Sequence, residues 1–437
     1  MKTIVTTIQR GAKVNKVLLK NLLAFAKEHQ VTTIQAFVMD GRNKDDIDID
    51  PIVFDNDIEL IVPHKAGKAL NSNLKLYDTM IKASQINPLT GFNKKLSRDH
   101  SYILPSPKIR YLSIPNTSKF PRFLCTTGSL THGNYKLHTA QGRKANLEHQ
   151  YGFIYVDVRS SKKFEIHQVD ALKNGKFNYL DEYYSGGKKL KQQPEAIILG
   201  DIHWGETCPK TWKRNLKMIT DLKPKRVVIH DLFDGRSINP HERDNYATRA
   251  LRASLKQDNL EDELREVYKL INSLSNKYPD VEFVVSESNH DLFLKRYVTE
   301  HNWLSDGRNS LLSSELFKPF VTGTSKPNLQ VALETFGDIP RNFNFLLEDQ
   351  EYRVAGIELG YHGHRGLNGA RGSSASFDRY NLKMITGHEH TPKLYANGMV
   401  VGTSTYLKLP YTKGASSWLN ANGILYKSGK YTLLTLV

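Results

Sequence analysis

Apolar residues in the first 190 positions follow both the helical and the strand period. Over residues 15–28 they recur at helical spacing behind Asn15, a residue type suited to capping a helix N-terminus. We therefore expect a helix there. Residues 31–39 predict a strand, and residues 150–158 and 163–169 predict a β-hairpin with a short polar turn between its strands.

The pattern changes after residue 195, where short apolar runs alternate with amphipathic stretches. Amphipathic helices are expected over residues 211–222 and 246–277. Strands are expected at residues 196–199, 226–229, 281–285, 352–359 and 382–385. Strands that alternate with helices indicate an α/β domain with a layered core.

A polar stretch over residues 186–194 opens with Gly186-Gly187 and predicts a linker between these two halves. We therefore expect an accessory α+β domain over residues 1–190, with a DNA-binding or assembly role, and an α/β domain over residues 191–437. Five lysines near the boundary either line a phosphate-binding face or are simply solvated: Lys162, Lys163, Lys188, Lys189 and Lys191.

The composition is that of a globular protein, with 39% hydrophobic and 24% charged residues among 437. No apolar run approaches the roughly 20 residues of a membrane helix, so no membrane span is expected. The first residues lack the apolar core of a signal peptide, and the two cysteines, Cys125 and Cys208, fit a reducing compartment. These features together predict a cytoplasmic location.

The formal net charge of +16 predicts an affinity for polyanions through counterion release. Lysines that merely solvate the surface would produce the same charge. The charge therefore favours nucleic acid only if the chemistry of the site also acts on phosphate esters.

Five short clusters of carboxylate, imidazole and amide residues follow predicted strands in the second half of the chain. They are Asp201-Ile202-His203, His230-Asp231-Leu232-Phe233-Asp234, Asn289-His290-Asp291, His362-Gly363-His364 and Gly387-His388-Glu389-His390. Ligands of α/β sheets bind beyond the carboxyl ends of the strands, so we expect the five loops to converge on one site. One Asp-x-His motif recurs by chance, whereas five clusters in this order indicate a metal centre.

These motifs resemble the calcineurin-like metallophosphoesterase superfamily. Its pattern is Asp-x-His, Gly-Asp-x-x-Asp, Gly-Asn-His-Asp/Glu, a further His and Gly-His-x-His, and the resemblance covers about residues 195–405. His230 and Ser288 stand where the superfamily has glycine. Neither position supplies a metal ligand, so we expect only altered loop packing. The resemblance implies a layered β-sandwich flanked by helices.

The resemblance further implies two adjacent divalent ions, with a bridging hydroxide that attacks phosphorus in line. Ligation by nitrogen and oxygen without thiolate suits transition metals better than Ca²⁺. Mn²⁺ is the metal expected, with Zn²⁺, Fe or Mg²⁺ as alternatives. The implied ligands are Asp201, His203 and His390 for the first ion, Asn289, His362 and His388 for the second, and Asp231 as the bridge.

Other residues of the clusters have implied roles around these ligands. His290 matches the general acid or transition-state stabiliser of the superfamily, a role that suits imidazole near neutral pH; the alternative is a structural loop histidine. Asp234 and Asp291 are expected to orient ligands, and His364 either does the same or contacts substrate.

Two basic loops favour a nucleic-acid substrate. Arg236 lies in a polar loop that follows Asp231, and its Asp-Leu-Phe start resembles the double-strand-break repair nucleases of the superfamily. Arg365 and Arg371 flank a glycine-rich loop after His364. Glycines let backbone amides approach phosphate and arginines fork onto its oxygens, although an ordinary surface loop would have a similar sequence.

Motifs in the first half resemble the early proteins of T5-type phages, which degrade host DNA and act in DNA transfer. They lie at residues 121–131, 149–158 and 177–181. The expected function is therefore a two-metal-ion DNase that acts on DNA without sequence preference, in the host cytoplasm if a phage encodes it.

Two other functions remain open at the level of sequence. One is a metal-dependent phosphatase acting on protein or small molecules, although Ser286-Glu287-Ser288 lacks the arginine that precedes Gly-Asn-His in Ser/Thr phosphatases. The other is a DNA-binding regulator on a degenerate esterase fold. Endo- or exonuclease action, strand preference and homo-oligomer formation are not determined by the sequence.

Overall fold

The computed structural model describes residues 1–42, 48–61, 67–118, 120–300, 302–380, 382–409 and 412–436. The chain is mixed α/β with several sheets and forms two compact units. The first unit comprises Met1–Pro194, Thr391–Met399 and Leu407–Val437, and the second comprises Glu195–His390 and Val400–Tyr406. The expected boundary after residue 190 is close to the observed one, but most of the C-terminal segment belongs to the first unit.

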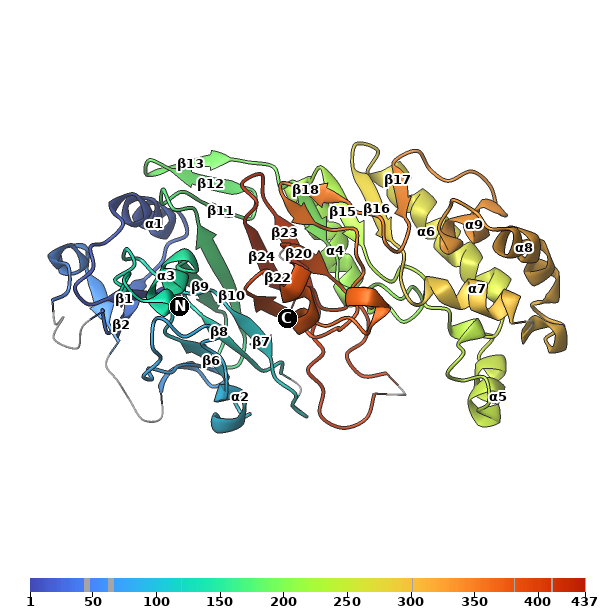
Figure 1. Cartoon of the computed structure of the whole chain (residues 1–437), viewed down its shortest axis with the longest axis horizontal. Helices are drawn as coiled ribbons and strands as arrows, with labels where there is room; N and C mark the ends of the chain where they lie inside the picture. Colours follow the sequence, from blue (N-terminus) through green and yellow to red (C-terminus); the bar gives the residue numbers. More distant parts are fainter. Residues whose placement is uncertain are drawn as a thin grey trace. The chain divides into compact units, whose positions relative to one another are not determined.

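A five-stranded sheet with the order β10-β9-β1-β2-β3 organises the first unit (Figure 1). Strands β1, β2 and β3 are parallel, and β9 and β10 form the predicted antiparallel hairpin. The helix α1 (Lys16–Glu28) joins β1 to β2, and the Oδ1 atom of Asn15 caps it by accepting the Leu18 N–H at 3.1 Å. The strands are β1 Lys2–Gln9, β2 Thr33–Met39, β3 Ile58–Leu60, β9 Tyr151–Val158 and β10 Phe164–Ala171.

The apolar face of α1 packs into an aromatic core, where Phe25 has its ring centroid 5.5 Å from that of Phe153 and 5.4 Å from that of Tyr184. A three-stranded sheet made of β11 (Phe177–Tyr179), β12 (Glu182–Ser185) and β13 (Lys188–Lys191) contributes to this core.

The expected linker over residues 186–194 is wrong, because β13 pairs with β12 in this sheet. Gly186 and Gly187, which were expected to begin the linker, instead form the tight turn between β12 and β13, with φ of 64° and 79°. All four side chains of β13 are exposed, so no apolar alternation marked the strand. Within it Lys189 forms an ion pair with Glu28, so this lysine is already neutralised by a carboxylate.

Further strands of the first unit follow the order β21-β7-β8-β6-β5-β4. Two short helices, α2 (Phe92–Lys95) and α3 (Ala140–Leu147), accompany them, and β23 (Ala421–Leu425) and β24 (Tyr431–Thr435) form a hairpin that turns at Ser428-Gly429. The strands are β4 Lys68–Asn71, β5 Leu74–Leu76, β6 Ser101–Leu104, β7 Tyr111–Ser113, β8 Phe123–Thr126, β21 Lys393–Tyr395 and β22 Gly398–Val400.

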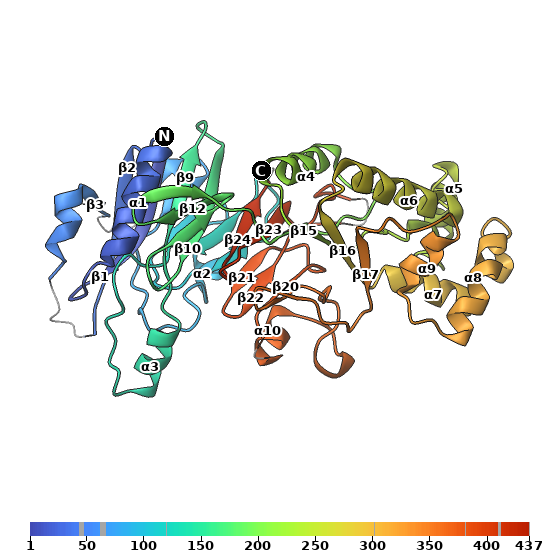
Figure 2. The ribbon, with the colours of Figure 1, turned by 90° about the horizontal axis from the view of Figure 1, so that it is seen from above.

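Four parallel strands in the order β14-β15-β16-β17 form the centre of the second unit. They are β14 Ala196–Ile198, β15 Arg226–Ile229, β16 Glu282–Ser286 and β17 Phe343–Leu346. The helices α4 (Pro209–Leu222) and α6 (Leu260–Lys277) run along one side of these strands (Figure 2). The two helices are tied together where the Tyr278 hydroxyl donates to the Leu216 carbonyl at 3.0 Å.

Two elements of the second unit differ from expectation. The helix expected over residues 246–277 is two helices, α5 (Tyr246–Ser254) and α6, because Lys256 has a φ of 56° and Asn259 caps α6. The strand expected over residues 352–359 is a hairpin of β18 (Arg353–Val354) and β19 (Ile357–Glu358), which turns at Ala355 and Gly356 with positive φ.

The strand expected at residues 382–385 is present as β20 (Met384–Thr386), which pairs in parallel with β19. The remaining helices of this unit were not predicted from the sequence. They are α7 Asp291–Thr299, α8 Ser310–Thr322, α9 Asn328–Glu334 and α10 Ser374–Phe377. No helix in the described part of the chain is long and apolar enough to cross a membrane.

Candidate metal centre

The clusters predicted to converge do so at the carboxyl ends of the strands of the second unit. Asp201 and His203 follow β14, Asp231 follows β15, and Asn289 follows β16. Of the other expected ligands, His362 follows β19, and His388 and His390 follow β20. Backbone hydrogen bonds join the loops: the His203 N–H donates to the Asp231 carbonyl at 2.6 Å, and the Gly387 N–H donates to the His362 carbonyl at 2.8 Å.

Four buried side chains form the first group of ligand-type atoms: Asp201, His203, Asp231 and His390, each with an atom within 4.8 Å of the others. The Nε2 atoms of His203 and His390 lie 3.0 Å apart. Asp201 Oδ2 lies 3.1 Å from His390 Nε2, and Asp231 Oδ2 lies 3.4 Å from His203 Nε2. These are the four residues that the resemblance assigned to the first ion and the bridge.

A second group consists of Asp231, His362 and His388, again within 4.8 Å. His362 Nε2 lies 3.1 Å from Asp231 Oδ2, and the rings of His362 and His388 have centroids 5.3 Å apart. Asp231 is therefore common to both groups. Asn289, the fourth ligand expected here, has a buried Oδ1 atom with no hydrogen-bond partner in the described part of the chain.

Unsatisfied oxygen atoms provide a test of whether this site fits cations. Asp201 Oδ1, Asp231 Oδ1 and Asn289 Oδ1 are all buried without a hydrogen-bond partner among the described residues. Burying such atoms unpaired costs roughly 1–3 kcal/mol each. Three orphaned oxygens beside four converging imidazoles match the mixed nitrogen and oxygen donor set of a transition-metal site.

In this cluster, burial and the neighbouring charges shift the pKa values of Asp231 and His203 in opposite directions. Burial by itself would raise the pKa of Asp231, but the charges of His362 and His203 hold it well below the usual range. Burial by itself would lower the pKa of His203, but Asp231 and the hydrogen bond with Asp234 raise it to about 9. The carboxylates around His203 thus favour positive charge at this position.

Backbone strain is concentrated at the same residues. His203, Asp231, His388 and His390 have φ of 45°, 45°, 72° and 54°, in the left-handed region that residues other than glycine rarely adopt. Each such residue costs of order 1 kcal/mol and persists only where the surroundings impose it, which is typical of functional sites.

His290 is positioned by the loop after β15, since its Nδ1–H donates to the Asp234 carbonyl. Its ring lies edge to face with that of His203, with centroids 4.5 Å apart. Asp234 Oδ1 lies 3.1 Å from His203 Nδ1, which is the ligand-orienting contact expected for Asp234. The same aspartate therefore holds two histidines through different atoms.

Asp291 stabilises the loop that carries Asn289. Its Oδ2 accepts the Ser288 N–H at 2.8 Å while the Ser288 hydroxyl accepts the Asp291 N–H at 3.2 Å. This reciprocal pair closes the turn that leads into α7 and contains Asn289. Ser288, which departs from the superfamily glycine, thus has a structural role.

Of the expected substrate residues, His364 lies beside the cluster, with its ring centroid 5.5 Å from that of His362. His364 and Arg365 both pair with Glu348, at 2.7 and 2.5 Å, and the Arg371 side chain is exposed. Arg236 packs over Gly205 and lies 3.8 Å from Glu206. Glu348 was missed because it follows β17, a strand that the sequence did not predict.

His230 and Gly387 were also missed as partners. A Cβ atom on Gly387 would lie 2.2 Å from Asp201 Oδ1 and 2.9 Å from the Cβ atom of His230. The bulky His230 therefore fits only because residue 387 lacks a side chain. The Gly-His-x-His motif signals this glycine in the sequence, but it gives no indication of what the glycine contacts.

No family model matches the sequence. The chain is similar to Protein A1 of Escherichia phage T5, with 29% identity over 366 residues that make up 79% of this chain and 65% of that protein. The chain thus spans less than two thirds of the length of this relative. The similarity is to a T5 phage protein, in agreement with the resemblance noted in the first half of the sequence.

Among solved structures, the crystal structure of Chaetomium thermophilum Vps29 aligns with 44% of this chain and 98% of its own, at 12% identity. The TM-score of 0.24 is too low to establish a shared fold.

Proposed function

We propose that the second unit is a calcineurin-like metallophosphoesterase that uses two divalent ions to hydrolyse phosphodiesters, and that its substrate is DNA. The observation that carries the proposal is the place of Asp231, which belongs both to the group with Asp201, His203 and His390 and to the group with His362 and His388. One carboxylate shared by two ligand sets suits a pair of ions about 3.5–4 Å apart, the spacing used for in-line displacement at phosphorus.

The chain would hold the two ions with the ligand sets named above, and Mn²⁺ is the proposed metal. When bound, such ions polarise the phosphodiester and lower the pKa of water. The other residues provide positions and proton transfer. Asp234 fixes the ring of His203, and the backbone N–H of His388 donates to Asp201 Oδ2 at 2.8 Å, which orients that carboxylate.

His290 is proposed as the proton donor to the leaving oxygen. Its Nδ1–H is engaged with the Asp234 carbonyl, so Nε2 is the atom that exchanges a proton. The edge-to-face contact with His203 keeps the ring beside the ligand cluster. A positioned imidazole contributes about 10²–10⁴-fold to rates of this kind.

Three observations support DNA as the substrate. The chain has a net charge of +16, and it is similar to a phage protein. The third is a pocket of about 390 Å³ after β15, lined among others by Arg236, Arg243 and Arg249. Tyr246, also in its wall, is 85% exposed and offers a ring on which a base can stack.

The test is hydrolysis by the full chain, first stripped with EDTA and then supplied with Mn²⁺. Cleavage of plasmid DNA that requires Mn²⁺ and disappears in Asp231→Asn supports the proposal. A matched control is Asp221→Asn, the same change at an exposed residue of α4 that pairs with Lys217. Turnover of p-nitrophenyl phosphate with intact DNA would favour a phosphatase, and binding of DNA without any hydrolysis would favour a regulator.

A further inference from the structure

A second pocket lies in the first unit, at the carboxyl ends of its parallel strands. Its volume is about 690 Å³, within the range of small-molecule sites. Arg10 follows β1 directly, and Asp40 and Arg42 follow β2. This edge of an open α/β sheet is where ligands bind in such folds. The pocket is made within the first unit alone and shares no residue with the candidate metal centre.

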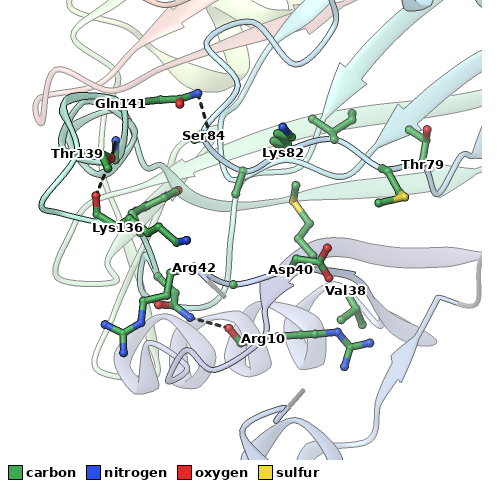
Figure 3. Close-up of a pocket in the computed structure, with 18 of the residues that line it drawn as sticks. Arg10, Val38, Asp40, Arg42, Thr79, Lys82, Ser84, Lys136, Thr139 and Gln141 are labelled. Carbon is green, nitrogen blue, oxygen red and sulfur yellow. Dashed lines mark hydrogen bonds between the residues drawn. The ribbon is translucent and has the colours of Figure 1, made fainter. Parts of the chain in front are cut away.

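Four stretches of the sequence build the pocket: the ends of β1 and β2, residues 78–84, and the loop and start of α3 (Figure 3). The ends of β1 and β2 are joined where the Arg10 N–H donates to the Met39 carbonyl at 2.9 Å. The loop before α3 is joined to them by Asn134, whose side-chain amide donates to the Arg10 carbonyl at 2.9 Å. Residues 78–84 are anchored by Ile81, which packs with Met39 in a buried apolar cluster.

The polar lining combines cationic and carboxylate groups. Its charged residues are Arg10, Arg42, Lys82, Lys136, Asp40 and Asp78. Figure 3 shows Arg10, Asp40 and Arg42 on one side of the pocket and Lys82 and Ser84 on the other. With four cationic groups against two carboxylates, the pocket favours an anion.

The position of Lys136 is fixed by the start of α3. Thr139 caps the helix by accepting the Gly142 N–H at 3.0 Å, and its own hydroxyl donates to the Lys136 carbonyl at 2.9 Å. A Cβ atom on Gly142 would lie 2.1 Å from that carbonyl, so the glycine allows the close approach. The N-terminal end of α3 adds partial positive charge at the same wall.

The apolar lining argues against inorganic phosphate as the ligand. Val38, Met80 and Ala83 line the pocket with the charged groups, and Met80 is 94% exposed. A methionine that remains exposed beside cations can pack on a planar ring. The carboxylates of Asp40 and Asp78 can accept hydrogen bonds from amino or hydroxyl groups. Phosphate, planar base and hydrogen-bond donors occur together in a nucleotide.

We propose that this pocket binds the phosphate and base of a nucleotide, supplied either as a free nucleotide or as one unit of a DNA strand. Lys82 and Lys136 contact the phosphate, and Met80 packs against the base. The inference does not depend on hydrolysis at the metal centre, because binding is measured without divalent ions.

The experiment uses the full chain in EDTA and a short fluorescein-labelled oligodeoxynucleotide, followed by fluorescence anisotropy. The variant Lys82→Glu/Lys136→Glu is compared with Lys94→Glu/Lys95→Glu, which changes the charge equally at exposed lysines outside the pocket. We expect the pocket variant to bind the oligonucleotide at least about tenfold more weakly, and the control variant to change much less. The slope of log K against log salt concentration should become shallower by about 0.7 for each phosphate contact that is lost.

Competition separates the two sources of the ligand. Displacement of the labelled strand by dAMP supports a free-nucleotide site, and displacement only by unlabelled strand supports a DNA-binding site. The milder Lys82→Gln/Lys136→Gln and Met80→Ala variants serve if charge reversal disturbs folding, as judged by circular dichroism. Equal affinity in the pocket and control variants would overturn the proposal. So would displacement of the labelled strand by inorganic phosphate at the concentration at which dAMP displaces it.

Discussion

At the scale of single residues, the carboxylate of Asp234 fixes the orientation of the His203 ring in the candidate metal centre. This carboxylate lies 3.1 Å from His203 Nδ1, opposite the Nε2 atom that faces the cluster. Asp234→Asn keeps the shape but weakens this contact. We expect Mn²⁺ affinity to fall about 10–100-fold, by calorimetry, and excess Mn²⁺ to restore DNA cleavage. Unchanged affinity, or a loss of cleavage that Mn²⁺ does not rescue, would argue against the role.

Two buried histidines of the first unit make its stability depend on pH. Burial lowers the pKa of both His149 and His167 to about 4. His149 accepts from the Tyr135 hydroxyl at Nδ1 and donates to the Thr131 carbonyl at Nε2, so an added proton would break the first bond.

The sign of this effect follows from linkage. The unfolded chain binds protons below about pH 6.5, whereas the folded unit binds them only near pH 4. Stability is therefore complete above pH 6.5 and falls as the pH drops toward 4, by up to about 3 kcal/mol per histidine. Urea titrations across this range measure it. A His149→Gln variant should show a shallower pH dependence, and an identical slope would contradict the assignment.

At the scale of elements, the loop after β20 must pass close to the loop after β14. A Cβ atom on Gly387 would clash with Asp201 Oδ1. We expect Gly387→Ala to cost roughly 1–3 kcal/mol in unfolding free energy and to abolish tight Mn²⁺ binding. The control is Gly307→Ala, where no atom of the described residues lies within 4 Å of the added methyl group. Equal behaviour of the two variants in thermal melts and metal titrations would refute this packing account.

The elements that the sequence predicted share a strong local signal. Strands β14, β15 and β16 are short and mostly apolar, and α1 has both a cap and an apolar stripe. Ligand loops that follow such strands could therefore be placed correctly. The site was more predictable than the surrounding fold, because its motifs follow the strands with the clearest patterns.

The elements that were missed lack such a signal or depend on positive φ. The strand β13 is entirely polar and exposed, and the β18–β19 turn depends on Ala355 in the left-handed region. The break between α5 and α6 likewise depends on Lys256. Contacts that involve Glu348 could not be expected, since sequence patterns do not indicate which distant loop contacts His364.

At the scale of the whole molecule, the first unit is built from both ends of the chain. Strand β21 pairs with β7, and Lys430 forms an ion pair of 2.7 Å with Asp170. The expected domain of residues 1–190 lacks these partners. We therefore expect a fragment of residues 1–194 to unfold at a lower temperature than the first unit in the full chain, and to be digested faster by protease. Equal resistance would show that the C-terminal segments are dispensable.

The central claim is that one carboxylate, Asp231, organises two metal positions. Native mass spectrometry of the Mn²⁺-loaded chain measures this directly by counting bound ions in the wild type and in Asp231→Asn. The account predicts two Mn²⁺ per wild-type chain and at most one in the variant. The account would be contradicted if the wild-type chain bound a single Mn²⁺ ion, or if the wild type and Asp231→Asn bound the same number of ions.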